Sequence, residues 1–487
     1  MRKIIVLYDD VECVSPDINS FFKVKSYGKI FYKGRTLQEF MMETFKASNI
    51  DEVIVLSSMH DYETTISKVY YTKEQHRKNT YIYIKSNIVF ENLKSFELLI
   101  EKLSLLDDDL LVNVKGNKYS LMRFGADVCM EFLTNYHKDK NFNTYSLEIL
   151  NNENFLLDIS HYGDFIKFLH TNFEVRYFNK IVDKEEYLIK ISHNKEKIKQ
   201  EYRYFQLIND ELRMFFPTVF NYSEKEHEAS YCIEKINVPD MAIQYVSNTL
   251  SESEFLSFLK KIRYFLEKSN ITVATSDEYA KKMDKQYVSK VMERYQSLQE
   301  NTSLSKKLDL FLKAGTKYDS IEAVYKLYFT SFQKKFQKVK PLLYTTFCHG
   351  DLCLSNILYD KRTQYVKLID PKGIVENNNG YTDPYYDMAK LSHSILGCYD
   401  FINYGMFDIT VDNDVELKLQ IKAIDKNVAM YQRIFKSFIE GFGIDISFLR
   451  LLESSLFLSM LPLHADNEKK VLAFLLQGIH ILEECSE

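Results

Sequence analysis

The sequence predicts an α/β domain with a mainly parallel sheet, followed by an α+β domain that has a small β-rich lobe and a larger α-rich lobe. Three observations support this. The chain has 487 residues, more than one hydrophobic core usually supports. Strand and helix patterns alternate over residues 1–145, whereas strands come first and helices afterwards over residues 150–487. Only 14 glycines and 7 prolines leave little room for long linkers, so the domains are expected to abut.

The first domain, residues 1–145, contains short aliphatic runs separated by amphipathic segments. The runs are of strand length and predict strands at Lys3–Leu7, Val53–Leu56, Tyr81–Ile84 and Leu110–Val114. Apolar residues at helical spacing predict helices at Thr36–Ser48 and Asn92–Leu105. Because strands joined by helices of this length usually run parallel, we expect a mainly parallel sheet. The polar segment Asn141–Asn154 marks the expected domain boundary.

The second domain, residues 150–487, is expected to consist of a small lobe over about 150–245 and a large lobe over about 246–487. In the small lobe the patterns predict a hairpin, a charged helix and a third strand, at 175–181 with 186–191, 194–208 and 230–236. In the large lobe the pattern becomes helical. Ser251 and Glu254 have the spacing of a capping box at the start of its first long helix.

Composition excludes several classes of partner and site. A net charge of −5, from 63 basic and 68 acidic residues, gives no electrostatic footprint for nucleic acid or an anionic membrane. No apolar run approaches the roughly 18 residues that span a bilayer, and the apolar run at the N-terminus is too short for a signal peptide. Seven cysteines without a CxxC motif favour a reducing compartment, so we expect a cytoplasmic protein. Cys348 and Cys353 have no second pair and read as small buried residues rather than metal ligands.

The strongest chemical signal lies in the segment 347–373. Asp351 is followed by Asn356 five positions later, and Asp370 comes fourteen positions after that, directly behind the largely apolar run 366–369. In phosphoryl transfer a carboxylate must reach the acceptor hydroxyl while an amide on the same loop holds a metal. A second acid must then arrive on a separate strand to bridge metal and phosphates. These three residues match that requirement.

The segment resembles the aminoglycoside phosphotransferase and choline kinase family, whose signature is HGDxxxxN followed by an IDxxG-like segment. The fixed positions are met by His349, Gly350, Asp351, Asn356, Ile369, Asp370 and Gly373. The resemblance implies a bilobal protein-kinase-like fold and an ATP-dependent kinase that uses Mg²⁺. It also implies that Asp351 is the catalytic base or hydroxyl-orienting carboxylate, that Asn356 and Asp370 bind Mg²⁺, and that His349 has a structural role.

Further segments fit the same resemblance. Residues 380–391 look like the family's GDPxxDLA segment, in which Asp387 would anchor the helix behind the catalytic loop. Asp383 could do likewise or face the substrate. Lys190 stands within an apolar strand and Glu201 follows eleven residues later in a charged helix, so we pair them as the lysine that holds the α- and β-phosphates and its partner.

The strand at 231–236 falls where this family places its hinge, so backbone groups near Glu234 to Ile236 are expected to contact adenine. One family feature is missing. No glycine-rich loop stands between Phe173 and Ile181, which leaves open how the phosphates are held. Arg176 could compensate, although an exposed arginine is the simpler interpretation.

The acceptor is expected to be small. Only twelve residues separate Asp370 from Asp383, too few for the activation segment on which protein kinases dock a peptide. A sugar, polyol or amino alcohol is expected, and the domain pair resembles enzymes that activate precursors of bacterial surface polysaccharides or teichoic acids. The alternatives are a bifunctional kinase and nucleotidylyltransferase, and a non-catalytic, kinase-like protein that senses nucleotide.

The first domain faintly resembles sugar-phosphate nucleotidylyltransferases, through the segments 34–40 and 49–55. That family begins with a glycine-rich LAAGxGTR segment, where this chain has the acidic pair Asp9 and Asp10. Its metal-binding Asp would fall near Ser86–Asn87, where no carboxylate stands. We therefore expect a degenerate domain without transferase activity that serves assembly or regulation, including a homo-oligomer formed through it. Asp9, Asp10 and Asp51 are the candidates for replacement metal ligands.

Overall fold

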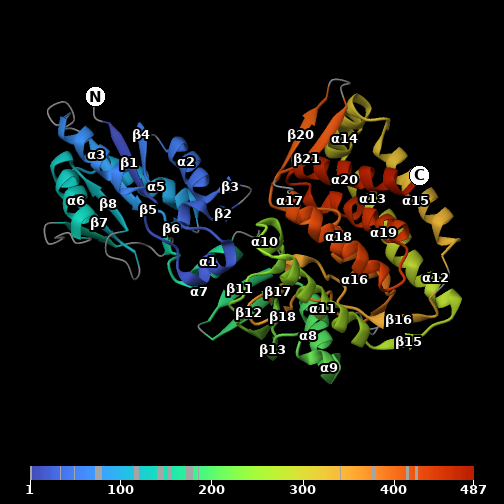
Figure 1. Ribbon diagram of the computed structural model, residues 1–487. Helices are drawn as coiled ribbons and strands as arrows, with labels where there is room; N and C mark the ends of the chain where they lie inside the picture. Colours follow the sequence, from blue (N-terminus) through green and yellow to red (C-terminus); the bar gives the residue numbers. More distant parts are fainter. Residues whose placement is uncertain are drawn as a thin grey trace. The chain divides into compact units, whose positions relative to one another are not determined.

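The computed structural model divides the chain into two compact units, Met1–Glu174 and Val175–Glu487 (Figure 1). Each unit buries its own set of large apolar side chains. The structure describes residues 3–32, 35–48, 50–71, 79–90, 92–114, 120–139, 147–151, 156–171, 179–184, 186–339, 342–374, 380–412, 416–422 and 426–486.

The first unit is built on a six-stranded sheet with the strand order β4-β1-β5-β8-β7-β9. Neighbouring strands are parallel, as predicted, except that β8 runs antiparallel to both β5 and β7. Only seven residues separate β7 from β8, too few for the helical crossover that a parallel pair needs. The strands are β1 (Ile4–Asp9), β4 (Glu52–Leu56), β5 (Thr80–Lys85), β7 (Leu110–Asn113), β8 (Leu121–Phe124) and β9 (Glu148–Asn151).

Shorter elements and helices surround this sheet. The helices are α1 (Pro16–Phe22), α2 (Leu37–Ala47), α3 (Met59–Tyr71), α5 (Leu93–Leu105), α6 (Ala126–Asp139) and α7 (Tyr162–Thr171), with the 3-10 turn η1 (Tyr27–Lys29). The two small ladders pair β2 (Phe31–Tyr32) with β3 (Arg35–Thr36) and β6 (Ile88–Phe90) with β10 (Leu156–Asp158). The predicted helices at 36–48 and 92–105 are α2 and α5, and each begins at a side-chain cap, Thr36 and Asn92.

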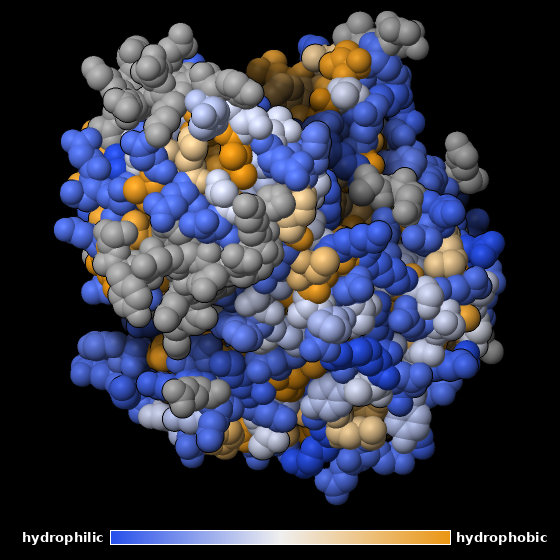
Figure 2. Space-filling model, turned by 60° about the vertical axis from the view of Figure 1, so that its left-hand side comes forward, coloured by the Kyte–Doolittle hydropathy of each residue, from blue (hydrophilic) through white to orange (hydrophobic). Residues whose placement is uncertain are grey.

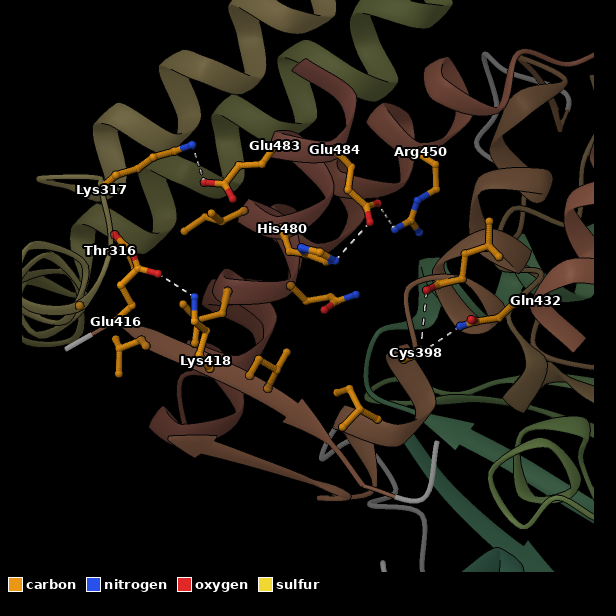
Figure 3. Close-up of a pocket in the computed structure, with 18 of the residues that line it drawn as sticks. Thr316, Lys317, Cys398, Glu416, Lys418, Gln432, Arg450, His480, Glu483 and Glu484 are labelled. Carbon is orange, nitrogen blue, oxygen red and sulfur yellow. Dashed lines mark hydrogen bonds and ion pairs between the residues drawn. The ribbon is translucent and has the colours of Figure 1, made fainter. Parts of the chain in front are cut away.

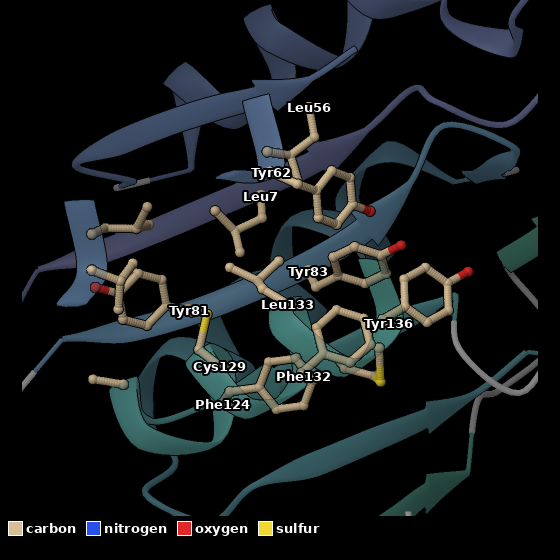
Figure 4. Close-up of a cluster of buried hydrophobic side chains, with 14 of the residues drawn as sticks. Leu7, Leu56, Tyr62, Tyr81, Tyr83, Phe124, Cys129, Phe132, Leu133 and Tyr136 are labelled. Carbon is tan, nitrogen blue, oxygen red and sulfur yellow. The ribbon is translucent and has the colours of Figure 1, made fainter. Parts of the chain in front are cut away.

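Helices cover both faces of the sheet. Alternate residues of β1 point to opposite sides, as a strand requires. Leu7 belongs to the core on the side of α3 and α6, where Tyr83 stacks edge-on against Phe132 with ring centroids 4.7 Å apart (Figure 4). On the other side Tyr8 contacts Phe45 of α2, with centroids 6.3 Å apart. The unit is therefore a three-layer α/β/α domain.

The division between the units lies later than the polar segment predicted. The expected domains were 1–145 and 150–487, whereas the first unit ends at Glu174. The physical reason is strand pairing. β9 joins β7 in the main sheet, and β10 pairs with β6, so both strands belong to the first unit rather than to a small lobe.

The second unit begins with a four-stranded antiparallel sheet in the order β11-β12-β14-β13. The predicted hairpin is formed by β11 and β12, although its residues 175–178 lie outside the described ranges. The predicted helix at 194–208 is α8, whose cap Asn194 accepts a hydrogen bond from Lys197 N. The elements of this small lobe are β11 (Asn179–Asp183), β12 (Tyr187–Ser192), α8 (Lys195–Leu207), α9 (Asp210–Arg213), β13 (Val219–Glu224) and β14 (Ala229–Glu234).

The large lobe is mainly helical, and its first long helix begins with the predicted capping box of Ser251 and Glu254. Its helices are α10 (Met241–Val246), α11 (Glu252–Lys268), α12 (Ser276–Asp284), α13 (Lys290–Glu300), α14 (Thr302–Gly315), α15 (Ile321–Phe336), α16 (Tyr385–Ile395), α17 (Tyr399–Asn403), α18 (Lys426–Glu440), α19 (Ile446–Met460) and α20 (Glu468–Ser486). Its short strands are β15 (Ile271–Val273), β16 (Tyr344–Phe347), β17 (Ile357–Asp360), β18 (Tyr365–Leu368), β19 (Tyr381–Thr382), β20 (Phe407–Val411) and β21 (Leu417–Ile421). Single turns are η2 (Lys285–Ser289, a π-helix), η3 (Leu354–Asn356) and η4 (Leu461–His464).

Within the described residues, one helical stretch is long and apolar enough, by length and composition, to span a bilayer, which the sequence expectation did not foresee. It comprises α19 and η4, Ile446–His464, with a mean hydropathy of 1.4, and 72% of its apolar window is buried inside the protein. Its position among α13, α15, α16 and α20 identifies it as the central helix of the large lobe. On the face shown in Figure 2, hydrophilic residues cover most of the described surface and hydrophobic residues form small groups between them.

The core of the first unit provides a test of this packing. Leu133 of α6 is fully buried, whereas Leu98 of α5 is 57% exposed. We expect Leu133→Ala to lower the stability of the unit by about 2–5 kcal/mol because it leaves a cavity. The matched change Leu98→Ala should cost within about 0.5 kcal/mol. Hydrogen exchange of the β1 and β5 amides measures this, and equal exchange in the two variants would contradict the assignment of the core.

Candidate active site

A buried lysine links the two lobes of the second unit. Lys190 lies in the middle of β12, and its Nζ is 2.7 Å from Glu201 Oε2 and 2.8 Å from Asp370 Oδ1. Glu201 is on the inner face of α8, where Ile198 and Phe205 stand one turn away on either side and are also buried. Tyr231 of β14 donates a further hydrogen bond to Glu201. The structure thus brings together three of the residues singled out in the sequence.

Charge pairing keeps this group ionised. Burial acts to lower the pKa of Lys190, but Asp370 and Glu201 outweigh it and hold the pKa above its ordinary value. For Asp370, burial acts to raise the pKa, and Lys190 lowers it below the ordinary value. The side chain of Lys190 is 6% exposed, whereas that of Asp370 is 52% exposed. The carboxylate of Asp370 is therefore charged. Lys190 holds it on one side, and its other side is open to solvent.

The β17–β18 hairpin sets Asn356 and Asp370 next to each other. Ile357 pairs with Leu368 at its open end, and Ile369 N donates to Asn356 O at 2.9 Å. Asn356 Nδ2 donates to the main-chain oxygen of Asp351 at 2.8 Å, which fixes the loop that carries Asp351 against the hairpin. The three motif residues Asp351, Asn356 and Asp370 therefore belong to one rigid arrangement, although nineteen positions separate the first from the last.

Asp387 and His349 hold the loop that carries Asp351 in place. Asp387 of α16 accepts hydrogen bonds from His349 N at 2.7 Å and Gly350 N at 2.8 Å, which is the predicted anchoring role. His349 is fully buried, and burial lowers its pKa to about 4, so the ring is neutral at pH 7. Its Nδ1 accepts from Asp351 N at 3.3 Å. This contact orients the loop.

Asp383, whose role the sequence left open, lies inside the large lobe. It is fully buried and accepts hydrogen bonds from Tyr287 Oη at 3.2 Å and Tyr385 N at 3.0 Å. Burial raises its pKa to about 6. These contacts tie the start of α16 to the π-turn η2, so the structure assigns Asp383 to support rather than to a surface that substrate could reach.

Backbone geometry explains the glycine positions of the motif. Gly373 has φ +85°, and a Cβ there would lie 2.9 Å from both Gln200 C and Glu201 N of α8. The glycine thus allows the loop after Asp370 to touch the backbone of the helix that carries Glu201. Asp370 itself has φ +54°, a conformation that costs a non-glycine residue energy and is concentrated at functional sites.

The expected hinge residues lie where β14 leaves the small lobe. Glu234 is the last residue of β14, and its main chain and carboxylate both bond to the backbone of Thr218. Ile236 lies in the extended segment 235–239 that leads to α10 and the large lobe. The predicted adenine contact stays a prediction. Arg176 and the segment in place of a glycine-rich loop, 172–178, lie outside the described residues.

Three lysines that the sequence did not single out gather around Tyr386 next to Asp351 and are termed here the lysine cluster: Lys290, Lys372 and Lys390. Lys390 of α16 pairs with Asp351 Oδ1 at 2.8 Å. Lys290 donates to Tyr386 Oη at 3.0 Å, and Lys372 Nζ lies 5.3 Å from the centre of the Tyr386 ring. The signal available in the sequence was the four-residue spacing of Tyr386 and Lys390, which puts both on one face of a helix.

The residues present fit a nucleotide and a divalent cation. Carboxylate and amide oxygens are the donors Mg²⁺ prefers, and Mg²⁺ commonly takes only one or two protein ligands while phosphates and water supply the rest. The hydrogen bond from Asn356 Nδ2 commits its nitrogen and leaves its oxygen for a cation. Over the ranges described, no group of three or more His, Cys, Asp or Glu side chains forms a ready metal site. A site with only two protein ligands, Asn356 and Asp370, agrees with the absence of such a group.

The acidic residues of the first unit are engaged in its own structure. Asp9 accepts hydrogen bonds from Tyr62 and Tyr83, and Asp10 from Gly28 N and Ser26. Asp51 accepts from Ile4 N. The sequence placed no carboxylate at 86–87, but the fold brings Asp158 of β10 there, 2.8 Å from Asn87 Nδ2. This approach could not be read from the chain because the two residues are 71 positions apart.

No protein-family model matches the chain, and no curated protein does. Among solved structures, the chain is similar to a thermostable mutant of aminoglycoside phosphotransferase APH(4)-Ia in ternary complex with AMP-PNP and hygromycin B, at 12% identity and a TM-score of 0.38, over 65% of this chain and 97% of that one. A glucosamine kinase matches at 11% identity and 0.34, over 63% and 74%. A putative glucose-1-phosphate thymidylyltransferase from Bacillus anthracis, in complex with a sucrose, matches at 8% and 0.24, over 36% and 97%. Likenesses this distant carry no argument about this chain.

The lysine cluster predicts an unusual titration. Burial acts to raise the pKa of Tyr386, but Lys290, Lys390 and Lys372 outweigh it and lower the pKa to about 8. Because the chain has 35 tyrosines, the phenolate absorbance of Tyr386 is best measured as the difference between the wild type and Tyr386→Phe. We expect a transition near pH 8, shifted upward in Lys290→Gln because the phenolate then loses a cation. A Tyr386 transition at or above its ordinary pKa, about 10, would contradict the arrangement.

Proposed function

We propose that this protein is an ATP-dependent kinase that transfers a phosphoryl group to a hydroxyl of a small molecule. The observation that carries the proposal is the meeting of Asp351, Asn356 and Asp370 on one loop and hairpin, with Lys190 held beside Asp370. Binding the phosphates of a nucleotide and neutralising their charge requires a lysine held in place and an accessible carboxylate for the metal. Lys190, paired with Glu201, and the half-exposed Asp370 meet this requirement.

Each residue has a defined task in the proposed mechanism. Lys190, positioned by Glu201, would donate hydrogen bonds to phosphate oxygens. Asn356 and Asp370 would hold Mg²⁺, which supplies charge neutralisation when bound. Asp351 would accept a hydrogen bond from the acceptor hydroxyl and take its proton as that oxygen bonds to the phosphorus and the bond to the leaving diphosphate breaks. Most of the rate acceleration would come from positioning and electrostatics.

The acceptor we propose is a sugar, polyol or amino alcohol. Its small size is supported by the short connection of twelve residues between Asp370 and Asp383, the second of which is buried. We also propose a cytoplasmic role in making precursors of bacterial surface polysaccharides or teichoic acids. The first unit would then serve assembly or regulation, including formation of a homo-oligomer.

The catalytic assignment predicts a large loss of turnover on two isosteric changes. Asp351→Asn and Asp370→Asn should each lower kcat by on the order of 10² or more, because the first removes the proton acceptor and the second a metal ligand. Only Asp370→Asn should also weaken MgATP binding. ATP consumption with a panel of small hydroxyl compounds, together with calorimetric titration of MgATP, measures both effects.

Asp210→Asn is the matched control, since Asp210 lies on α9 of the small lobe with its side chain 99% exposed. It should leave kcat and MgATP affinity unchanged. Near-native turnover of Asp351→Asn would remove the mechanism. MgATP binding without transfer to any acceptor would favour the alternative, a non-catalytic protein that senses nucleotide.

A further prediction is that the first unit does not transfer nucleotides. Asp9, Asp10 and Asp51 already accept hydrogen bonds within the unit, which leaves them poorly placed to bind a metal. Incubation with nucleoside triphosphates and the phosphorylated product should release no pyrophosphate above background. Mg²⁺-dependent release that persists in Asp351→Asn would instead show a bifunctional enzyme. In that case Asp158, beside Asn87, is the first residue to replace.

A further inference from the structure

The lysine cluster gathers around Tyr386 and reaches Asp351 through Lys390. Lys390 bonds to Asp351 itself, and Lys372 packs over Gly350, the residue before it. A Cβ on Gly350 would lie 2.7 Å from Lys372 Cβ, so the glycine lets the lysine approach the catalytic loop this closely. A molecule that presents a hydroxyl to Asp351 would therefore lie close to Lys390 and Lys372.

A separate element delivers the third member of the cluster, Lys290. Lys290 is the first residue of α13, directly after the π-turn η2, and π-turns within helices are common at functional sites. Tyr287 in that turn bonds to Asp383, which holds the turn against the start of α16. Lys290 reaches across to Tyr386 of α16, with its Nζ 5.1 Å from the ring centre. The convergence is therefore built by the fold.

The positive charge of the cluster is only partly balanced. Asp351 neutralises Lys390. For Lys290 and Lys372, no carboxylate lies within ion-pair distance in the part of the chain that the structure describes, and their contacts there are with Tyr386. Like charges held together in this way favour an anionic partner.

A cavity elsewhere in the large lobe shows the contrast. It measures about 800 Å³ and lies between the β20–β21 hairpin and helices α18, α19 and α20 (Figure 3). Most of its charged residues pair with one another: Lys317 with Glu483 at 3.0 Å, Arg450 with Glu484 at 3.1 Å and Lys418 with Glu416 at 2.6 Å. Lys436 is the one charged residue of this lining without an ion-pair partner in the described part of the chain, and it is exposed. The lysine cluster holds two such lysines close to Asp351, so it is the stronger candidate for recognition of an anion.

We propose that the acceptor of this kinase carries an anionic group, a phosphate ester or a carboxylate, that binds Lys290 and Lys372 while its hydroxyl faces Asp351. This inference rests on the proposed function and narrows its acceptor class. A sugar acid, a sugar phosphate or a polyol phosphate satisfies the cluster. The cluster would repel a protonated amino alcohol or an aminoglycoside, because their cation would stand beside Lys290 and Lys372, which already lack carboxylate partners in the described part of the chain.

The test is calorimetric binding to the full-length protein saturated with Mg²⁺ and a non-hydrolysable ATP analogue, so that the nucleotide site is filled. The probes are a matched series: glycerol, glycerate, glycerol 3-phosphate and the amino alcohol serinol. We expect the anions to bind about tenfold or more tightly than glycerol or serinol, since a hydrogen bond between charged groups contributes enough for that ratio. If only glycerol 3-phosphate binds more tightly, the anionic group of the acceptor is a phosphate ester. If glycerate and glycerol 3-phosphate bind equally, the cluster is a general anion site.

Lys290→Gln and Lys372→Gln should each reduce anion affinity about tenfold while binding of the nucleotide analogue is kept. Lys281→Gln, a matched change of an exposed lysine on α12, should leave both unchanged. Absence of anion preference in protein that binds the analogue would overturn this inference alone. Loss of analogue binding in the two variants would show that the cluster binds the nucleotide, and this result would also overturn the inference. Failure of the wild type to bind the analogue would overturn the proposed function itself.

Discussion

The arrangement of the second unit depends on one buried ammonium group. Lys190 is almost fully removed from water, and a buried charge is tolerated only when it is closely paired. It is satisfied by Glu201 from the small lobe and by Asp370 from the hairpin of the large lobe. Glu201 Oε1 also lies 3.8 Å from Lys197 Nζ, so two lysines stand beside the two carboxylates. The exposed side of Asp370 is where a further cation can be reached.

The surrounding backbone makes this pairing possible. Gly373 allows the loop after Asp370 to touch α8 at Glu201. Asp387 holds the loop that carries Asp351 by accepting hydrogen bonds from the main chain of His349 and Gly350. The hairpin register sets Asn356 against the strand that ends before Asp370. Positioning of this kind is what phosphoryl transfer asks of a protein, because the protein contributes little covalent chemistry. The strained φ of Asp370 fits a residue held for function rather than for stability.

Much of the site could be predicted because its residues are close in sequence or fall at fixed intervals. Asp351, Asn356 and Asp370 lie within twenty residues, and Lys190 and Glu201 belong to consecutive elements. The lysine cluster as a whole could not be predicted, since Lys290 at the start of α13 comes to Lys372 and Lys390 from a distant part of the chain. The same limit applies to Asp158 beside Asn87 and to the late division between the units, because both depend on how β6, β9 and β10 pair. The antiparallel direction of β8 has a local cause, because the connection between β7 and β8 is too short for a crossover.

The central claim is that Lys190, Asn356 and Asp370 form a binding site for the phosphates of ATP and its cation. A crystal structure of the protein with Mg²⁺ and a non-hydrolysable ATP analogue tests it most directly. We expect the cation to be bound by oxygens of Asn356 and Asp370, and Lys190 to bond to phosphate oxygens while it keeps its contact with Glu201. A nucleotide bound elsewhere, or phosphates that leave Lys190 and Asp370 untouched, would contradict the account.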